Sequence, residues 1–299
     1  MRNVQTVTSA PVLRRREFLL RIAAASASGV AGISRMRASA AEAKETYATI
    51  AKGIRILPGQ WRPHYPWEHI AWVSPSWPSQ DYIWLDFPEA IFTDRGLLYL
   101  SHVNPDAPAL YESWPAVPWR VDEDGISFER SLPDGVVFGG KVSRGSEITV
   151  DLELHLRNGS EQPLRNITLQ TCAFLRAAKE FADYTRDNKF VHVPGKGWQT
   201  YPEAAEAPAD RGAYGVGWRS HNGKADLPVM VTTSNEAERL MAMTWFDATL
   251  SMVSNGNHPC MHADPHFPDL EPGATHTIHG KLIFFEGPLD GFRFEDYIA

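Results

Sequence analysis

Residues 148–157 read Ile-Thr-Val-Asp-Leu-Glu-Leu-His-Leu-Arg, and this stretch decides the fold class. Apolar side chains alternate with polar ones from Ile148 to Leu156. Because successive side chains of a β-strand point to opposite faces, the pattern predicts a strand with one buried and one solvated face. Such half-buried strands are typical of antiparallel sheets.

Shorter runs of the same character lie on both sides of this strand. The turn signal Asn158-Gly159-Ser160 and the alternating run 167–175 predict a second strand, paired with the first in a hairpin or meander. Further strands are expected at Gly96–Leu100, Val136–Phe138 and Thr275–Phe285. Helical periodicity is confined to 176–184 and 204–209. The sequence therefore predicts an all-β fold, a large antiparallel β-sandwich with few short helices.

The first forty residues have the composition of an export signal. The run Arg14-Arg15-Arg16-Glu17-Phe18-Leu19 precedes a mildly apolar, Ala-rich segment, and Ala38-Ser39-Ala40 has the small residues of a cleavage site. This order is typical of a twin-arginine signal peptide. We expect residues 1–40 to be removed and residues 41–299 to form a single β-sandwich domain, periplasmic or secreted and exported in folded form.

The chain that remains after cleavage is acidic. The whole sequence has 29 basic and 36 acidic residues, and residues 1–40 hold seven arginines and one glutamate, which leaves a net charge near −13. Such a surface repels phosphate backbones and anionic lipids. We therefore expect no nucleic-acid partner. We also expect no membrane insertion after signal cleavage, because no remaining segment is apolar and long enough to span a bilayer.

Two cysteines, Cys172 and Cys260, leave two alternatives open. In an exported protein a pair of cysteines favours a disulfide. A protein that folds in the reducing cytoplasm before export would instead keep two separate thiols.

Residues 258–266 read His-Pro-Cys-Met-His-Ala-Asp-Pro-His and carry the densest set of reactive side chains in the sequence. In an extended backbone the alternate side chains share one face: His258, Cys260, His262, Asp264 and His266. Pro259 and Pro265 favour extended geometry for the residue before each of them. Because prolines lack an N–H donor, they also indicate an edge strand or an extended loop at the rim of a sheet.

Two chemical interpretations of this segment stay open. In the first, His258, Cys260 and His262 bind Zn²⁺ or a similar divalent metal, with a distant ligand such as His102. In the second, His262 and Asp264 form a metal-free acid/base pair, because imidazole titrates near neutrality and a carboxylate can orient it. A polar loop without a ligand is the structural alternative to both.

Tryptophan is concentrated in the N-terminal half of the chain. Ten tryptophans occur in all, and seven of them lie between residues 61 and 119, several beside prolines. An indole exposed in such a loop can stack on the C–H face of a sugar ring, whereas a buried one is ordinary core. Trp77 and Trp84 are the predicted stacking platforms.

Other polar residues complete the predicted site. His102 follows the strand ending at Leu100 and is expected at a sheet rim, opposite His262 and Asp264. Asp86 and Glu89 flank Phe87-Pro88 and could supply an acid or cap a turn. Asn188 and Lys189 lie in a loop that could position substrate, and His266 is a further predicted substrate contact.

The segment Cys260–Asp269 is followed by Leu270-Glu271-Pro272-Gly273-Ala274 and the last strand. This order resembles the end of galactose mutarotase-like domains, where a strand carrying the catalytic glutamate precedes a Phe-Pro-Asp-type loop and a Leu-x-Pro-Gly turn. The resemblance covers about 30 residues. It implies a β-supersandwich, a fold used by sugar epimerases, by non-catalytic sugar-binding domains and within some polysaccharide lyases and hydrolases.

This sequence departs from the epimerase pattern at the general base. No glutamate stands there, and His262 and Asp264 are the nearest groups. The chain is also similar to exported bacterial proteins of unassigned function that share Ser-His-Val-Asn-Pro, here from Ser101, and Cys-x-His-x-Asp-Pro, here from Cys260.

Together these observations predict an exported protein that acts on a sugar or polysaccharide. The predicted chemistry is acid/base catalysis of the lyase, hydrolase or epimerase type, at a rim site around His262 and Asp264. Two other classes remain: a non-catalytic carbohydrate-binding module, and a metal-dependent enzyme that uses the His/Cys/Asp segment.

Overall fold

The computed structural model describes residues 51–102, 109–209 and 211–298, all within the compact unit Ala51–Ala299. The predicted signal peptide, residues 1–40, lies outside the described residues. Within the described ranges, no helix has the length and apolar character needed to cross a membrane.

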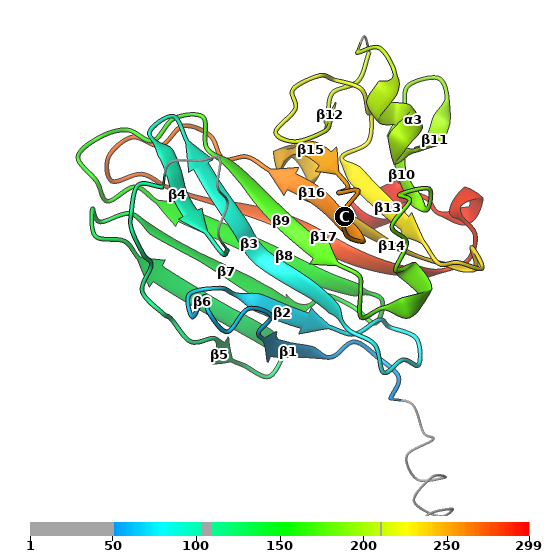
Figure 1. Ribbon diagram of the computed structural model, residues 1–299, viewed down its shortest axis with the longest axis horizontal. Coiled ribbons are helices and arrows are strands. Elements are labelled where there is room, and N and C mark those ends of the chain that lie inside the picture. Colours follow the sequence, from blue (N-terminus) through cyan, green and yellow to red (C-terminus); the bar gives the residue numbers. More distant parts are fainter. Residues whose placement is uncertain (1–50, 103–108, 210, 299) are drawn as a thin grey trace, which may run out of the picture. The chain divides into compact units, whose positions relative to one another are not determined.

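The first of two large sheets contains eight strands (Figure 1). Its order is β1-β2-β3-β9-β16-β15-β12, with β4 paired to β3 beside this path. All its pairings are antiparallel except that of β12 with β15. The strands are β1 (Ile56–Gly59), β2 (Ile70–Val73), β3 (Ile83–Thr93), β4 (Gly96–Leu100), β9 (Thr168–Phe174), β12 (Gly215–Val216), β15 (Thr249–Val253) and β16 (Cys260–Pro265).

The second sheet contains nine strands, all paired antiparallel, in the order β11-β10-β13-β14-β17-β8-β7-β6-β5. Its strands are β5 (Arg120–Val121), β6 (Gly125–Ser131), β7 (Val137–Arg144), β8 (Thr149–Arg157), β10 (Lys189–Val193), β11 (Gly197–Thr200), β13 (Val229–Thr233), β14 (Arg239–Thr244) and β17 (Thr275–Glu286). The described residues include one α-helix, α3 (Tyr201–Glu206), and four 3₁₀ turns: η1 (Lys179–Phe181), η2 (Phe246–Ala248), η3 (Leu289–Gly291) and η4 (Phe294–Tyr297). The all-β prediction is confirmed.

The main hydrophobic core lies between the two sheets. The apolar face of β8 is buried in this core, as its alternation predicts, together with Met261 and Ala263 from β16. On its other face the nine-stranded sheet carries a smaller cluster that includes Phe292 and Phe294 near the C-terminus. The remaining surface of interest is therefore the outer face of the eight-stranded sheet, directed away from the main core.

The predicted hairpin between residues 148–157 and 167–175 is wrong. Both runs are strands, but β8 pairs with β7 and β17 in one sheet, whereas β9 pairs with β3 and β16 in the other. The connection between them crosses from sheet to sheet. Asn158 stabilises this crossing, because its side-chain amide donates hydrogen bonds to the carbonyl oxygens of Gln162 and Leu270.

The predicted edge position of the His/Cys/Asp segment is also wrong. β16 lies between β9 and β15 and is buried along its whole length. Its prolines do not interrupt the central pairings, because Pro259 precedes the strand and Pro265 is its last residue. The extended geometry was predicted correctly. The segment forms a central strand, with Cys260, His262 and Asp264 on one face and the core residues Met261 and Ala263 on the other.

Candidate functional site

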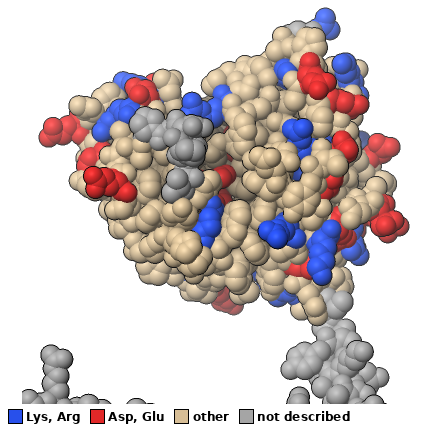
Figure 2. Space-filling model, viewed as in Figure 1, with Lys and Arg blue, Asp and Glu red and all other residues tan. Residues whose placement is uncertain are grey.

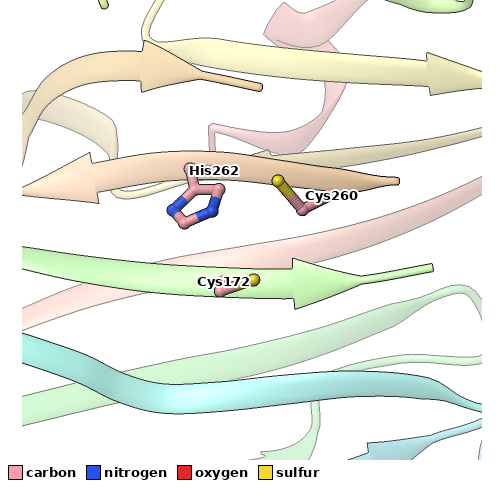
Figure 3. Close-up of side chains that lie close together, drawn as sticks. All are labelled: Cys172, Cys260 and His262. Carbon is pink, nitrogen blue, oxygen red and sulfur yellow. The ribbon is translucent and has the colours of Figure 1, made fainter. Parts of the chain in front are cut away.

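Three neighbouring strands bring reactive side chains into one row on the outer face of the eight-stranded sheet. Asp86 on β3 lies opposite Cys172 on β9, and Cys172 lies opposite His262 on β16. Cys260 is two residues before His262 and therefore faces the same way. Figure 3 shows Cys172, Cys260 and His262 close together on β9 and β16.

Asp264 orients the His262 ring. Nδ1 of His262 lies 3.3 Å from Oδ1 of Asp264 and 3.9 Å from Oε2 of Glu89. The same Asp264 oxygen accepts a 3.0 Å hydrogen bond from the Thr171 backbone N–H. His262 is only 1% exposed, and its buried Nε2 atom has no hydrogen-bond partner among the residues that the structure describes. Nδ1 therefore pairs with Asp264, and Nε2 is the ring nitrogen available to bind a ligand or a proton.

The two thiols and the imidazole are electrostatically coupled. A hydrogen bond with Cys172 and the charge of His262 hold the pKa of Cys260 far below its usual value, against the opposing effect of burial. The same hydrogen bond, together with burial, raises the pKa of Cys172. Burial alone would lower the pKa of His262, but the Cys260 thiolate and Asp264 raise it well above the ordinary range. The geometry thus favours a thiolate–imidazolium pair beside a protonated Cys172.

A second group consists of Asp86, Glu89 and His102, whose ligand atoms lie within 4.8 Å of one another. The register of β3 against β9 shifts between Asp86 and Ala90, which is where Glu89 lies. Nε2 of His102 is 2.7 Å from Oε1 of Glu89. Ser101 donates a 2.8 Å hydrogen bond to Asp86. Glu89 also approaches His262, so the two groups adjoin.

Glu89 and His102 shift each other's pKa towards their charged forms. Burial would raise the pKa of Glu89, but the hydrogen bond with His102 and the charge of His262 lower it. Burial would lower the pKa of His102, but Glu89 raises it. A carboxylate–imidazolium pair is therefore the favoured state of these two residues.

Arg62 holds the loop between β1 and β2 over this site. Its guanidinium donates to Oε2 of Glu68 at 2.9 Å and to Oδ2 of Asp86. Glu68 also accepts a 2.7 Å hydrogen bond from the backbone N–H of Trp61. Burial raises the pKa of Asp86 to about 7, although the Arg62 charge opposes this shift.

A cleft with a volume of about 680 Å³ opens above these groups. It is lined by Trp61, Arg62, Tyr65, Glu89, Leu100, His102, Gln170, Cys172, Trp218, Asn255 and His258. Trp218 is 48% exposed, and its ring packs edge-to-face with the His262 ring, with the two ring centroids 5.0 Å apart. On the visible face of the unit, basic and acidic side chains are intermingled without a continuous basic patch (Figure 2).

The structure brings part of the predicted site together. His102 and His258 line the cleft, and Cys260, His262 and Asp264 form the buried layer beside it. Trp84 lies at its margin, where it contacts Trp61 and Phe174. Because His262 and Asp264 are both buried, they can reach a ligand in the cleft only through groups such as Glu89 and Cys172.

Trp77 does not serve as a stacking platform, contrary to the sequence-based prediction. It is 1% exposed, packs against Phe181 and Phe284, and donates its indole N–H to Glu180. The prolines beside it suggested an exposed loop, but the segment turns inward between the sheets.

Lys189, Asn188 and His266 also lie away from this cleft's lining. Lys189 is fully buried, and burial lowers its pKa to about 8. Asn188 donates hydrogen bonds to the backbone oxygens of Phe181 and Thr233, which is a structural role. His266 follows the last residue of β16, so it does not share the face of His262 and Asp264. It lines a separate pocket with Trp245 and His276.

Several contributors to the site were not predicted from the sequence, among them Trp61, Arg62, Gln170, Trp218, Asn255 and, as part of the thiol–imidazole group, Cys172. The signal for Cys172 would have been a second cysteine on the strand next to Cys260, on the same face of the sheet. That signal requires knowing that β9 and β16 are neighbours.

Neither a scan against protein-family models nor a search of curated proteins found a match for this chain. Among solved structures, the chain is similar to a putative aldose 1-epimerase from Escherichia coli K12, with a TM-score of 0.40, 8% identity, and coverage of 78% of this chain and 100% of that chain. It is similar to an aldose epimerase homologue from C. elegans, with a TM-score of 0.35, 12% identity, and 79% and 100% coverage. A third similar structure is galactose 1-epimerase from Lactobacillus acidophilus NCFM, with a TM-score of 0.35, 6% identity, and 79% and 100% coverage.

Proposed function

We propose that the cleft binds a carbohydrate and that Glu89 and His102 perform acid/base chemistry on it. The observation that carries this proposal is the 2.7 Å Glu89–His102 hydrogen bond inside a cleft that also presents the exposed ring of Trp218. The export prediction from residues 1–40 remains part of the proposal and places the substrate outside the cytoplasm.

The lining of the cleft supports a carbohydrate as the ligand. Sugar rings combine an apolar C–H face with a rim of hydroxyl groups. An exposed indole such as that of Trp218 offers the matching flat apolar surface. Arg62, Gln170 and Asn255 supply charged and amide groups for the hydroxyls. A mostly preformed cleft with a few fixed polar groups is the usual form of a small-ligand site.

The Glu89–His102 pair supports proton transfer. His102 is held protonated by Glu89 and is suited to donate a proton to a ring or glycosidic oxygen. Glu89 stays ionised, which keeps the imidazolium in place and leaves a carboxylate that can accept a proton from a hydroxyl. We therefore favour an enzyme that protonates and deprotonates sugar oxygens over a module that only binds.

Replacement of Trp218 by Ala is expected to weaken saccharide binding by about tenfold or more, which corresponds to about 1.4 kcal/mol for a lost aromatic contact. The fold should be maintained because Trp218 is half exposed. Isothermal titration calorimetry against a panel of mono- and oligosaccharides measures this change. Trp198→Ala is the matched control, since Trp198 packs on His192 and Phe292 outside the cleft. Equal affinities of wild type and Trp218→Ala would refute a stacking role for Trp218.

Turnover is expected to fall on the alkaline side of the pH profile. The pKa of His102 is raised above its ordinary value of 6.5 by Glu89, so its acid form persists at pH 6.5 and is lost only as the pH rises further. The midpoint of the alkaline limb of kcat/KM should therefore lie above 6.5. In His102→Gln this limb should be absent and activity low throughout. A limb unchanged in His102→Gln would assign the titration to another group.

A further inference from the structure

The thiol–imidazole group has the composition of a metal site that the proposed acid/base chemistry does not use. Cys172, Cys260 and His262 each offer one ligand atom, and these atoms lie within 4.8 Å of one another. All three residues are buried, and both cysteines are free. Thiolate and imidazole together are the ligands preferred by Zn²⁺ and other thiophilic ions.

The orientation of His262 matches that of a metal ligand. Metal-binding histidines almost always donate one ring N–H to a carboxylate or carbonyl, which fixes the ring and leaves the other nitrogen for the metal. Here Nδ1 faces Asp264, and Asp264 is itself held by the Thr171 N–H. Among the described residues, buried Nε2 has no hydrogen-bond partner of normal geometry, and the ring interacts with Cys260, another member of the same group. A buried polar atom in this condition is costly unless something binds it.

The ligand atoms of Cys172, Cys260 and His262 would have to move only slightly closer together to bind a metal with tetrahedral geometry. In a zinc site with Zn–S near 2.3 Å and Zn–N near 2.0–2.1 Å, the ligand atoms are about 3.5–3.8 Å apart. Rotation of the cysteine side chains within their rotamer wells can supply the remaining distance. Three protein ligands leave a fourth position for water or another ligand, and Cys172 borders the cleft.

The strand register makes a disulfide a poor alternative. Cys172 lies opposite His262, and Cys260 lies opposite Phe174, so the two cysteines are diagonal neighbours. Diagonal positions across antiparallel strands are typically about 7–8 Å apart at Cα. A disulfide usually requires about 4.4–6.8 Å between the Cα atoms.

We propose that Cys172, Cys260 and His262 bind one thiophilic divalent metal ion, with Zn²⁺ the expected one, and that Asp264 positions His262 for it. This inference goes beyond the proposed function, which rests on Glu89 and His102. It also differs from the set His258, Cys260 and His262 suggested by the sequence, because Cys172 takes the place of His258. Binding releases the thiol proton of Cys172 and the Nε2 proton of the His262 imidazolium to solvent, so both sulfurs bind as thiolates and the imidazole binds as the neutral ring.

Cobalt(II) titration of the metal-free full-length chain tests the site directly. Co²⁺ is the probe because a thiolate ligand gives it an intense charge-transfer absorption in the near ultraviolet. The expected result is saturation at one equivalent, with displacement of the cobalt by added Zn²⁺. Cys172→Ser and Cys260→Ser should each abolish the charge-transfer band or weaken cobalt binding by roughly 100-fold or more, because removing a mere supporting partner already costs about 10–100-fold.

Asp264→Asn distinguishes positioning from ligation. It should keep the charge-transfer band but weaken the affinity about 10–100-fold. His266→Gln is the matched control, since His266 belongs to the same segment but lines another pocket, and it should bind cobalt as the wild type does. Thermal unfolding of each metal-free variant shows whether it is folded.

Glu89→Gln separates this inference from the proposed function, because it should lose turnover and retain the cobalt spectrum. Cobalt binding without a thiolate charge-transfer band, lost in Glu89→Gln and retained in Cys172→Ser, would place the metal at Asp86, Glu89 and His102 and overturn the inference. Wild-type protein that shows two reduced thiols but no charge-transfer band would overturn it as well. So would a stable Cys172–Cys260 disulfide.

Discussion

Glu89→Gln is expected to reduce turnover of the saccharide substrate by about 10²- to 10⁴-fold, the range typical of a lost acid/base group. The substitution keeps the shape of the side chain but removes the negative charge that holds His102 protonated at 2.7 Å. Both halves of the proton-transfer pair are thus lost by one change. Saccharide affinity should change much less than kcat, because the exposed indole of Trp218 remains. Turnover followed by NMR, with calorimetry for binding, measures the two effects separately.

Glu129→Gln is the matched control for this experiment. Glu129 also lies beside a histidine, with its Oε2 atom 3.4 Å from Nε2 of His155, but it belongs to β6 in the other sheet. It should retain full turnover. Unchanged kcat in Glu89→Gln would contradict the assignment of Glu89, and saccharide binding without any wild-type turnover would identify a binding module instead.

Arg62→Met is expected to have the largest effect on stability, a loss of about 3–5 kcal/mol at pH values above 7, as for other broken buried ion pairs. The guanidinium pairs with Glu68 and Asp86, whose side chains are both 1% exposed. Without it two buried carboxylates lose their counter-ion. Urea unfolding of wild type and variant gives the difference in the free energy of unfolding.

The destabilisation by Arg62→Met should depend on pH in a defined direction. Burial already raises the pKa of Asp86 to about 7, so the folded state holds a proton that the unfolded state releases above the ordinary value of 3.8. Loss of Arg62 raises this pKa further. Between about pH 4 and 7 both proteins therefore lose stability at a similar rate as the pH rises, whereas above about pH 7 the wild type levels off and the variant continues to lose stability.

Arg239→Met is the control for the charge change. Arg239 pairs with Glu180 at 3.2 Å but is 37% exposed, and such surface pairs contribute only about 0–1 kcal/mol. An equally small effect in Arg62→Met would mean that the loop between β1 and β2 does not depend on its ion pairs.

The strands could be predicted from local pattern, because alternation reports which residues face a core. Residues 149–157 and 275–285 are strands as predicted, whereas Ile148 precedes β8 and is exposed. Which strands are neighbours is a different matter, because it depends on the path of the connections. The turn after Arg157 looked like a hairpin but leads to the other sheet, so the pairing of β8 with β9 was predicted wrongly.

The same limit applies to the site. Alternation correctly placed Cys260, His262 and Asp264 on one face of an extended strand. Their partners, Cys172 on β9 and Glu89 on β3, lie about 90 to 175 residues away in sequence, and only the sheet order brings them together. Burial is likewise a tertiary property, which is why the proline-flanked Trp77 was predicted on the surface and is found in the core.

The central claim is that the cleft on the outer face of the eight-stranded sheet is where a carbohydrate binds and reacts. A crystal structure of the Glu89→Gln variant with the saccharide that wild type converts tests it most directly. The sugar ring is predicted to lie against Trp218 with an oxygen within hydrogen-bond distance of His102. A saccharide bound elsewhere, for example in the pocket lined by Trp245, His266 and His276, with this cleft empty, would contradict the account.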